Sequence, residues 1–187
     1  MKLSTIPNLI TGLRMFLTIP IIGLLLHERY GESLALFFIA GFSDGVDGFL
    51  AKRYGWTSQL GGFLDPLADK LLLMGTILVL GWQALLPGWL VVLVVLRDVV
   101  IVSGALVYYY LIGPFKAAPL LISKINTLMQ LGLTLAVIFD RGVVALPPPL
   151  LTLGIYLTGL TTLASGVVYV QTWGRRALRE ARRTHVS

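Results

Sequence analysis

Four aspartates fall within 26 positions of a very apolar chain, in pairs whose spacing suits joint chemistry. Asp44 and Asp47 are three residues apart, and Asp65 and Asp69 are four apart. Residues at these spacings lie on one face of a helix, so each pair would present two carboxylates together. Four carboxylates that share an apolar site cannot all ionise unless cations neutralise them. The spacing therefore predicts a cation site that supports a reaction.

The side-chain chemistry favours a hard cation. The chain has no cysteine, and no histidine lies near the four aspartates, so the ligands would be oxygens alone. Oxygen ligands suit magnesium, manganese or calcium better than zinc. Four carboxylates suit two ions, which together can stabilise the attacking and the leaving oxygen of a phosphoryl displacement. The alternative, a set of intrahelical salt bridges, is short of cations, since only Lys52, Arg53 and Lys70 lie in the same stretch.

The composition indicates that lipid surrounds the elements that carry these residues. Of 187 residues, 56% are hydrophobic and 13% are charged, whereas about a quarter of the residues in a soluble domain are charged. The net charge of +6 comes with no basic stripe interleaved with aromatic residues, so nucleic acid is not expected as a partner.

Six apolar runs are long enough, or nearly so, to cross a bilayer as helices, which takes about 20 residues. The runs are Ile10–Leu26, Leu34–Ala51, Gly61–Leu80, Trp89–Leu111, Pro119–Phe139 and Leu150–Trp173. We therefore expect an all-α integral membrane protein with six transmembrane helices in one bundle, forming a single domain over residues 1–187. The first run is expected to be a retained helix rather than a signal peptide, because Arg14 lies inside it.

Short joins separate these runs, and no polar linker of domain-separating length occurs. The turn signals are Tyr30-Gly31, Tyr54-Gly55, Pro87-Gly88, Gly113-Pro114 and Pro147-Pro148-Pro149. The short join Lys52–Leu60 would bring the two aspartate pairs together near one membrane surface. Small residues beside them, Gly48, Ala51 and Gly61, leave room for a ligand or for close helix approach.

Basic residues in the joins predict the orientation of the bundle. One side holds nine of them and the opposite side holds two, Arg29 and Arg141. The nine are Lys2, Lys52, Arg53, Lys116, Arg175, Arg176, Arg179, Arg182 and Arg183. Because cytoplasmic joins carry the excess of Lys and Arg, both termini and the aspartates are expected at the cytoplasmic face of the membrane. In a bacterium this would be the inner membrane. The basic tail, residues 174–187, is expected either to lie on anionic headgroups as an amphipathic or frayed helix or simply to set the topology.

Four more basic residues fall inside the predicted spans: Arg14, Lys70, Arg97 and Lys124. With the four aspartates and Asp98 they make nine charges inside membrane segments. A purely structural bundle has little reason to hold so many, although Arg97 and Asp98 can form a local ion pair. The charges therefore indicate a functional site rather than a scaffold.

The segment from Asp44 to Asp69 resembles the signature of the CDP-alcohol phosphatidyltransferase family, in which D-x-x-D-G-x-x-A-R is followed, after eight residues, by G-x-x-x-D-x-x-x-D. Every spacing agrees. Lys52 replaces the usual arginine of the family, which keeps the positive charge without the fork geometry. The segments Pro7–Arg14 and Asp65–Lys70 also resemble the family.

The resemblance implies a six-helix membrane enzyme, usually a homodimer, that transfers a phosphatidyl group from CDP-diacylglycerol to an alcohol and releases CMP. It implies two divalent cations, Mg²⁺ or Mn²⁺. The implied metal ligands are Asp44, Asp47, Asp65 and Asp69, of which Asp69 is also the implied general base. The residues implied to surround the cytidine nucleotide are Gly48, Ala51, Lys52 and Gly61.

A further resemblance concerns the acceptor alcohol. Arg97-Asp98, the segment Ser123–Thr127 and Gln130 look more like CMP-forming cardiolipin synthases than like phosphatidylglycerophosphate synthases. The expected acceptor is therefore phosphatidylglycerol, and the alternative is glycerol 3-phosphate. The candidates for binding the phosphate of either acceptor are Arg14, Lys70, Arg97 and Lys124. Asn126, Thr127 and Gln130 can equally form ordinary interhelical hydrogen bonds.

A cation transporter would also place aspartates inside a helical bundle. Transporters, however, bind near the bilayer midplane at broken helices in repeated halves, and the sequence has neither feature. A non-catalytic scaffold has no need of the aspartates. Release of CMP from CDP-diacylglycerol by the purified protein would distinguish the enzyme from both.

Overall fold

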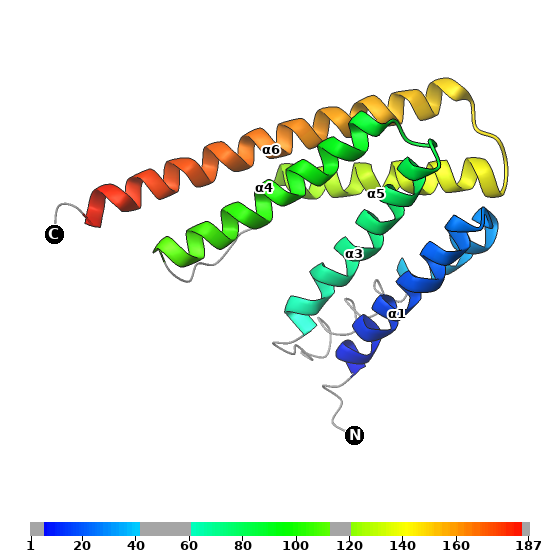
Figure 1. The fold of residues 1–187 in the computed structure, drawn as a ribbon, viewed down its shortest axis with the longest axis horizontal. Coiled ribbons are helices and arrows are strands. Elements are labelled where there is room, and N and C mark those ends of the chain that lie inside the picture. The colour runs from blue at the N-terminus through cyan, green and yellow to red at the C-terminus, as the bar shows by residue number, and fades with distance from the viewer. Residues whose placement is uncertain (1–5, 42–60, 113–120, 185–187) are drawn as a thin grey trace. The chain divides into compact units, whose positions relative to one another are not determined.

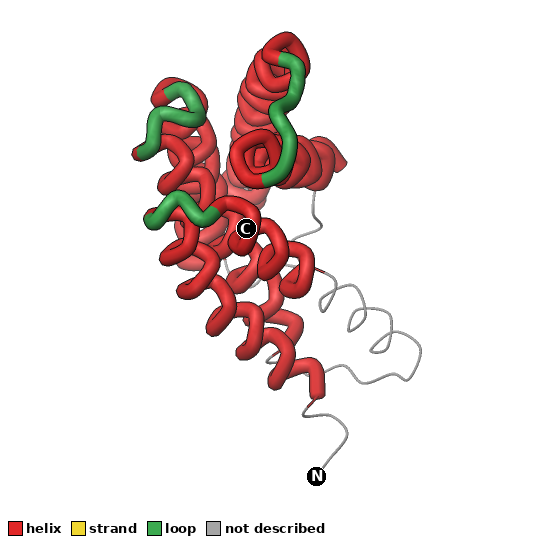
Figure 2. The backbone as a smooth tube through the Cα atoms, turned by 90° about the vertical axis from the view of Figure 1, so that its right-hand side faces the viewer, coloured by secondary structure: helices red, strands yellow, loops and turns green. Residues whose placement is uncertain are grey.

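The structure, a computed structural model, describes residues 6–41, 61–112 and 121–184, and every regular element in these ranges is an α-helix (Figure 1). The helices are α1 (Ile6–Leu26), the segment Tyr30–Gly41, α3 (Gly61–Trp82), α4 (Gly88–Ile112), α5 (Leu121–Gly142) and α6 (Pro148–Thr184). Where the joins are described, they are short loops (Figure 2). The predicted all-helical fold is confirmed for this part of the chain.

The described helices are consistent with membrane association. Two of them, Leu121–Gly142 and Pro148–Thr172, are long and apolar enough to cross a bilayer, each with a mean hydropathy of 1.5. Met15–Leu26 and Tyr30–Gly41 are shorter apolar helical segments. Six complete spans in one bundle stay a prediction. The backbone of α6 continues as a helix beyond the predicted span and through the basic tail to Thr184.

Helix boundaries follow the local sequence at two of the described joins. α4 begins at Gly88, directly after Pro87, and α6 begins at Pro148, where the fixed φ angle of proline suits a first turn. The predicted turn at Tyr30-Gly31 is wrong. The chain turns at residues 27–29, and both Tyr30 and Gly31 belong to the next helix. The signals at Tyr54-Gly55 and Gly113-Pro114 lie outside the described residues.

The chain divides into two compact units, each described here by itself. Unit 1 comprises residues 1–86 and 134–147, which include α1, Tyr30–Gly41, α3 and the last part of α5. Unit 2 comprises residues 87–133 and 148–187, which include α4, the first part of α5 and α6. A single domain over the whole chain stays a prediction.

In unit 1, α1 packs along α3 (Figure 1). Ile21 and Leu25 of α1 and Leu80 of α3 are fully buried. Gly75 brings the two helices close, because a Cβ at this position would lie 2.6 Å from Cδ1 of Ile22. In lipid, where apolar surface gains little by leaving the solvent, such close approach is what favours helix association.

At one end of unit 1 two backbones touch directly. A Cβ on Gly142, the last residue of α5, would lie 2.5 Å from the backbone nitrogen of Gly31 and 2.7 Å from the carbonyl carbon of Tyr30. Backbone atoms cannot swing aside as a flexible side chain can. Glycine at position 142 therefore allows α5 to end against the first turn of Tyr30–Gly41. Gly31 does not form the predicted turn; it takes part in this close backbone contact.

In unit 2, α4 packs along α6. The ring of Trp89 covers Gly159, where a Cβ would lie 2.8 Å from Cζ3 of the indole. The same ring stacks on Tyr156 with the ring centroids 6.1 Å apart. Further along the pair, the hydroxyl of Tyr169 donates to the carbonyl oxygen of Ile101 at 2.9 Å. These contacts hold α4 and α6 side by side and in parallel over the segment that carries Arg97.

Gly142→Ala is expected to lower the free energy of unfolding by about 1–3 kcal/mol, because the added Cβ overlaps backbone atoms of the neighbouring helix. Gly132→Ala is the matched control, since it lies in the same helix with open space around it. It is expected to be neutral or to stabilise by up to about 1 kcal/mol. Thermal unfolding in detergent compares the two, and equal unfolding temperatures would contradict the backbone contact.

Candidate active site

The aspartate motif starts outside the described residues and continues into α3. The motif residues that lie outside the described ranges are Asp44, Asp47, Gly48, Ala51 and Lys52. α3 begins at Gly61, and its backbone carries Asp65 and Asp69 four residues apart, on one helical face as the spacing predicted. The second half of the motif is therefore part of one continuous helix that packs on α1.

Asp69 is exposed, whereas Ala68 beside it is fully buried. Asp69 thus lies on a side of α3 that a ligand can reach. Lys70, the next residue, is half-buried. An exposed carboxylate can be reached by a metal ion or by an acceptor hydroxyl, as a ligand and a proton acceptor both require.

Among the described residues, no three Asp, Glu, His or Cys side chains come together in an arrangement that could hold a metal ion. Two of the four predicted ligands lie outside those residues, and the other two share a face of α3. The donor chemistry provides the test of fit. Carboxylates alone supply hard oxygen ligands, which suit Mg²⁺ or Mn²⁺. The residues fit such ions, and the site itself stays a prediction.

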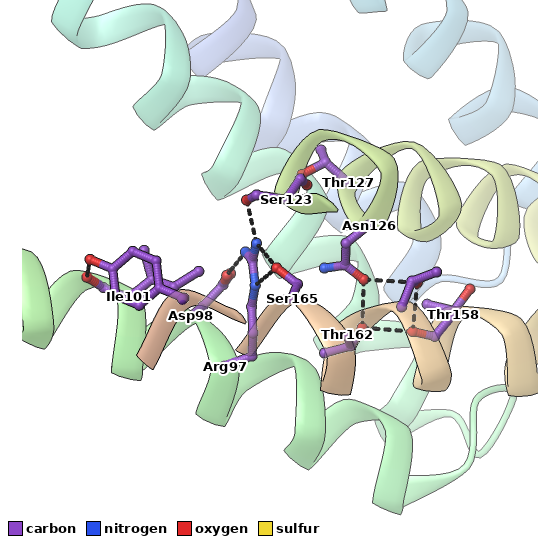
Figure 3. Close-up of polar contacts among 11 residues, drawn as sticks. Arg97, Asp98, Ile101, Ser123, Asn126, Thr127, Thr158, Thr162 and Ser165 are labelled. Atoms are coloured by element: carbon purple, nitrogen blue, oxygen red, sulfur yellow. Dashed lines mark hydrogen bonds and ion pairs between the residues drawn. The ribbon is translucent and has the colours of Figure 1, made fainter. Parts of the chain in front are cut away.

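In unit 2, Arg97 lies at the centre of a buried polar network (Figure 3). Arg97 and Asp98 are 9% and 7% exposed. Nη1 of Arg97 donates to Oδ1 of Asp98 at 2.8 Å. The Nε and Nη2 atoms of Arg97 donate to Oγ of Ser165 at 3.2 and 2.8 Å, and Nη2 also donates to Oγ of Ser123. The local ion pair is confirmed, and the guanidinium ties α4 to both α5 and α6.

This network bears on the four residues predicted to bind an acceptor phosphate. All three nitrogens of Arg97 already donate hydrogen bonds, so beyond the ion pair that the sequence indicated, Arg97 has a structural role in joining helices. Lys124, next to Ser123, is exposed. Arg14 on α1 and Lys70 on α3 belong to unit 1, and Arg97 and Lys124 belong to unit 2. Phosphate binding by these four stays a prediction.

Hydroxyl groups of α6 surround the side chain of Asn126 on α5. The hydroxyls of Thr161 and Thr162 lie 3.1 and 2.8 Å from Oδ1 of Asn126, and 3.1 and 2.7 Å from the carbonyl oxygen of Thr158. Interhelical hydrogen bonding by Asn126 is thus confirmed. Thr127, by contrast, bonds within its own helix, to the carbonyl oxygen of Ser123 at 3.1 Å.

Sequence reasoning did not identify the α6 partners. Thr158, Thr162 and Ser165 follow one another at spacings of four and three in an apolar run. Polar side chains at helical spacing in such a run are the signal that could have found them. Nδ2 of Asn126 and Nε2 of Gln130 are buried and have no hydrogen-bond partner in the described part of the chain. The hydrogen-bonding capacity of the buried polar side chains between α5 and α6 is therefore only partly satisfied by described protein groups.

Residues 4–171 match the family described as CDP-alcohol phosphatidyltransferase. A probable cardiolipin synthase (CMP-forming) of Drosophila melanogaster is 38% identical over 190 residues, which cover 90% of this chain and 58% of the relative. The chloroplastic CDP-diacylglycerol–glycerol-3-phosphate 3-phosphatidyltransferase 1 of Oryza sativa subsp. japonica is 35% identical over 157 residues, or 74% of this chain and 47% of the relative. The chain thus spans about half the length of these two curated relatives.

A solved structure shares the fold. It is the phosphatidylinositol phosphate synthase (PgsA1) of Mycobacterium tuberculosis, crystallised with CDP-DAG bound. The TM-score is 0.63 at 15% sequence identity, over 89% of this chain and 85% of that one. At this identity the likeness establishes the helical arrangement of the fold and nothing about the ligands of this chain.

Arg97→Lys is expected to lower the free energy of unfolding by about 1.5–3 kcal/mol, because an ammonium group cannot reach Asp98, Ser123 and Ser165 together. Lys124→Arg, an exposed exchange of the same two residue types, is the matched control and should leave unfolding unchanged. Thermal unfolding measures both. If Arg97→Lys unfolds like the native protein, the network does not hold the helices.

Proposed function

Because the chain belongs to the CDP-alcohol phosphatidyltransferase family, we propose that it transfers a phosphatidyl group from CDP-diacylglycerol to an alcohol and releases CMP. The observation that carries the proposal is the aspartate motif, which enters α3 with Asp65 and Asp69 on one face and with Asp69 exposed. The names of the two relatives support it, since one states CMP formation and the other states CDP-diacylglycerol as a substrate.

In the proposed reaction, the acceptor hydroxyl oxygen forms a bond to the phosphorus that carries diacylglycerol. The bond from this phosphorus to the CMP oxygen breaks, and CMP leaves with its electron pair. Asp69 takes the proton of the attacking hydroxyl, a role for which an exposed carboxylate is suited. Two divalent cations, Mg²⁺ or Mn²⁺, would be held by Asp44, Asp47, Asp65 and Asp69, and when bound they supply positive charge for the reacting phosphate oxygens.

The residues around the aspartates suit a nucleotide. Gly48, Ala51 and Gly61 are small residues, which would leave space beside the carboxylates for the cytidine. Lys52 brings a point charge for a phosphate oxygen, in place of a bidentate arginine fork. We therefore assign these four residues to the cytidine nucleotide of CDP-diacylglycerol.

For the acceptor we favour phosphatidylglycerol, which makes cardiolipin the product. This choice rests on the likeness of Arg97-Asp98 and Ser123–Thr127 to CMP-forming cardiolipin synthases, and on the name of the relative that is 38% identical. Glycerol 3-phosphate is the second candidate, favoured by the name of the rice relative. The two differ in their route, because a diacylated lipid enters sideways from the membrane and glycerol 3-phosphate enters from water.

The setting that we propose is a membrane bundle of six spans, assembled as a homodimer in a bacterial inner membrane. The nine-to-two distribution of basic residues between the two sides supports cytoplasmic termini and a cytoplasmic active site. The two described helices that are long enough to span a bilayer support the membrane setting.

The proposal predicts that purified protein releases CMP from CDP-diacylglycerol only when an acceptor and a divalent cation are present. Each acceptor is supplied in turn, and the lipid products are separated by mass. Cardiolipin is expected with phosphatidylglycerol, and EDTA should abolish its formation until Mg²⁺ or Mn²⁺ is restored. Phosphatidylglycerophosphate without cardiolipin would keep the family chemistry and overturn the acceptor. CMP release in metal-free buffer would overturn the metal assignment.

Asp69→Asn is expected to reduce turnover about 100-fold or more, because the variant cannot accept the hydroxyl proton. It should retain much of the CDP-diacylglycerol binding. Asp65→Asn, one turn earlier on the same face, is the comparison and should raise the Mg²⁺ concentration needed for half-maximal activity and weaken nucleotide binding. Titrations with Mg²⁺ and with CDP-diacylglycerol separate the two roles. Equal losses of binding in both variants would make Asp69 a ligand only.

A further inference from the structure

Unit 1 holds a cavity of about 540 Å³ where α1 and α3 end. Its lining residues are Leu26, Glu28, Tyr30, Trp82, Gln83, Ala84, Leu85 and Arg141. The volume lies within the range of about 300–1,000 Å³ that is typical of small-ligand sites. Asp69 and Trp82 are separated by roughly 20 Å along α3, at a helical rise of about 1.5 Å per residue. The cavity is therefore remote from the exposed aspartate and independent of the proposed reaction.

Two residues after the end of each helix at this cavity, the backbone adopts the left-handed conformation. Glu28 has a φ angle of 58° and Ala84 has one of 56°. The N–H groups of Arg29 and Leu85 donate to the carbonyl oxygens of Leu24 and Leu80, at 2.8 and 2.9 Å, and close the two helix ends. Glycine is the preferred residue at such a cap, so a side chain here has a conformational cost. Glu28 adopts the left-handed conformation despite this cost, and its carboxylate is thereby placed at the cavity wall.

Neutral side chains hold the wall in place. Nε2 of Gln83 donates to the carbonyl oxygen of Leu25 at 2.6 Å, and the hydroxyl of Tyr30 donates to Oε1 of Gln83 at 3.3 Å. The backbone contact between Gly31 and Gly142 fixes the end of α5, which carries Arg141 to the same cavity. The wall is thus built without using the charges of Glu28 and Arg141.

These two opposite charges line one cavity without pairing with each other. Among the described residues, Glu28 forms no ion pair, and Arg141 meets only its neighbour Asp140, with 3.6 Å between Nε and Oδ2. Burial raises the pKa of Tyr30, the charge of Glu28 raises it further and the charge of Arg141 lowers it, so both charges act at this wall. By contrast, Arg29 and Glu32, outside the cavity lining, pair with each other at 2.8 Å.

We propose that the cavity binds the phosphoethanolamine headgroup of a phospholipid, with the phosphate on Arg141 and the ammonium on Glu28. A ligand with both charges satisfies both side chains, and guanidinium suits phosphate oxygens in particular. Trp82, at the end of α3, is 86% exposed and is the kind of residue found at a membrane–water interface, where its ring can also contact the ammonium. Leu26 and Leu85 give the wall apolar surface for the first part of the acyl chains. The source of the headgroup is therefore the membrane.

The test is native mass spectrometry of the full chain in detergent, titrated separately with phosphatidylethanolamine, phosphatidylcholine and phosphatidylglycerol. Phosphatidylethanolamine should bind most tightly, since it alone combines the phosphate with an ammonium that can donate hydrogen bonds. Arg141→Gln and Glu28→Gln should each weaken its binding about tenfold or more. Arg29→Gln and Glu32→Gln remove the same charges within four residues of Glu28 but outside the lining, and they should have no effect.

Three results would overturn the proposal. The first is equal binding of phosphatidylethanolamine and phosphatidylglycerol, which would leave Glu28 without a role. The second is an equal loss in the Arg29 and Glu32 variants, which would indicate general surface charge. The third is equally tight binding of soluble glycerophosphoethanolamine, which would exclude a lipid source. Unfolding temperatures are measured for every variant. If Glu28→Gln does not fold, Glu28→Asn replaces it, because asparagine tolerates the left-handed conformation.

Discussion

A polar group buried away from water is costly unless it forms a hydrogen bond, and such bonds join several of the described helices. Arg97 finds an aspartate and two serines. Gln83 finds a carbonyl at the end of α1 and the hydroxyl of Tyr30. Together with the close packing at Gly75 and Gly159, these directional bonds fix how the helices of each pair lie along one another. One of these helices, α3, carries Asp65 and Asp69.

Much of the helical structure was predictable because the chain consists of long apolar runs that short joins separate. The predicted run Gly61–Leu80 became α3, ending at Trp82, and the run Trp89–Leu111 became α4, Gly88–Ile112. Proline marked the start of both α4 and α6, for a local steric reason that requires no tertiary structure. On α3, the predicted shared face of Asp65 and Asp69 follows from helix geometry alone.

What could not be predicted depends on contacts between distant residues. Gly31 looked like a turn residue, yet its place is set by Gly142, more than a hundred positions later. The left-handed caps at Glu28 and Ala84 use residues that do not favour this conformation, so no local preference announces them. The partners of Arg97 come from α5 and α6, and a sequence lists those serines without saying that they converge. Composition therefore predicts helices, while their registers emerge only from the assembled structure.

The two ends of α3 show how one helix can serve two surroundings. In its first half, Asp69 is exposed and belongs to a motif whose summed negative charge calls for cations. At its other end, a cavity offers one charge of each sign, for which a single zwitterion is the fitting partner. Between them, the polar hydroxyl of Thr76 is satisfied within the helix by the carbonyl oxygen of Leu72 at 2.7 Å. From Leu71 to Trp82, α3 carries no charged residue. The charged residues of α3 thus lie in its first half, and the charges at the far cavity come from Glu28 and Arg141 of neighbouring segments.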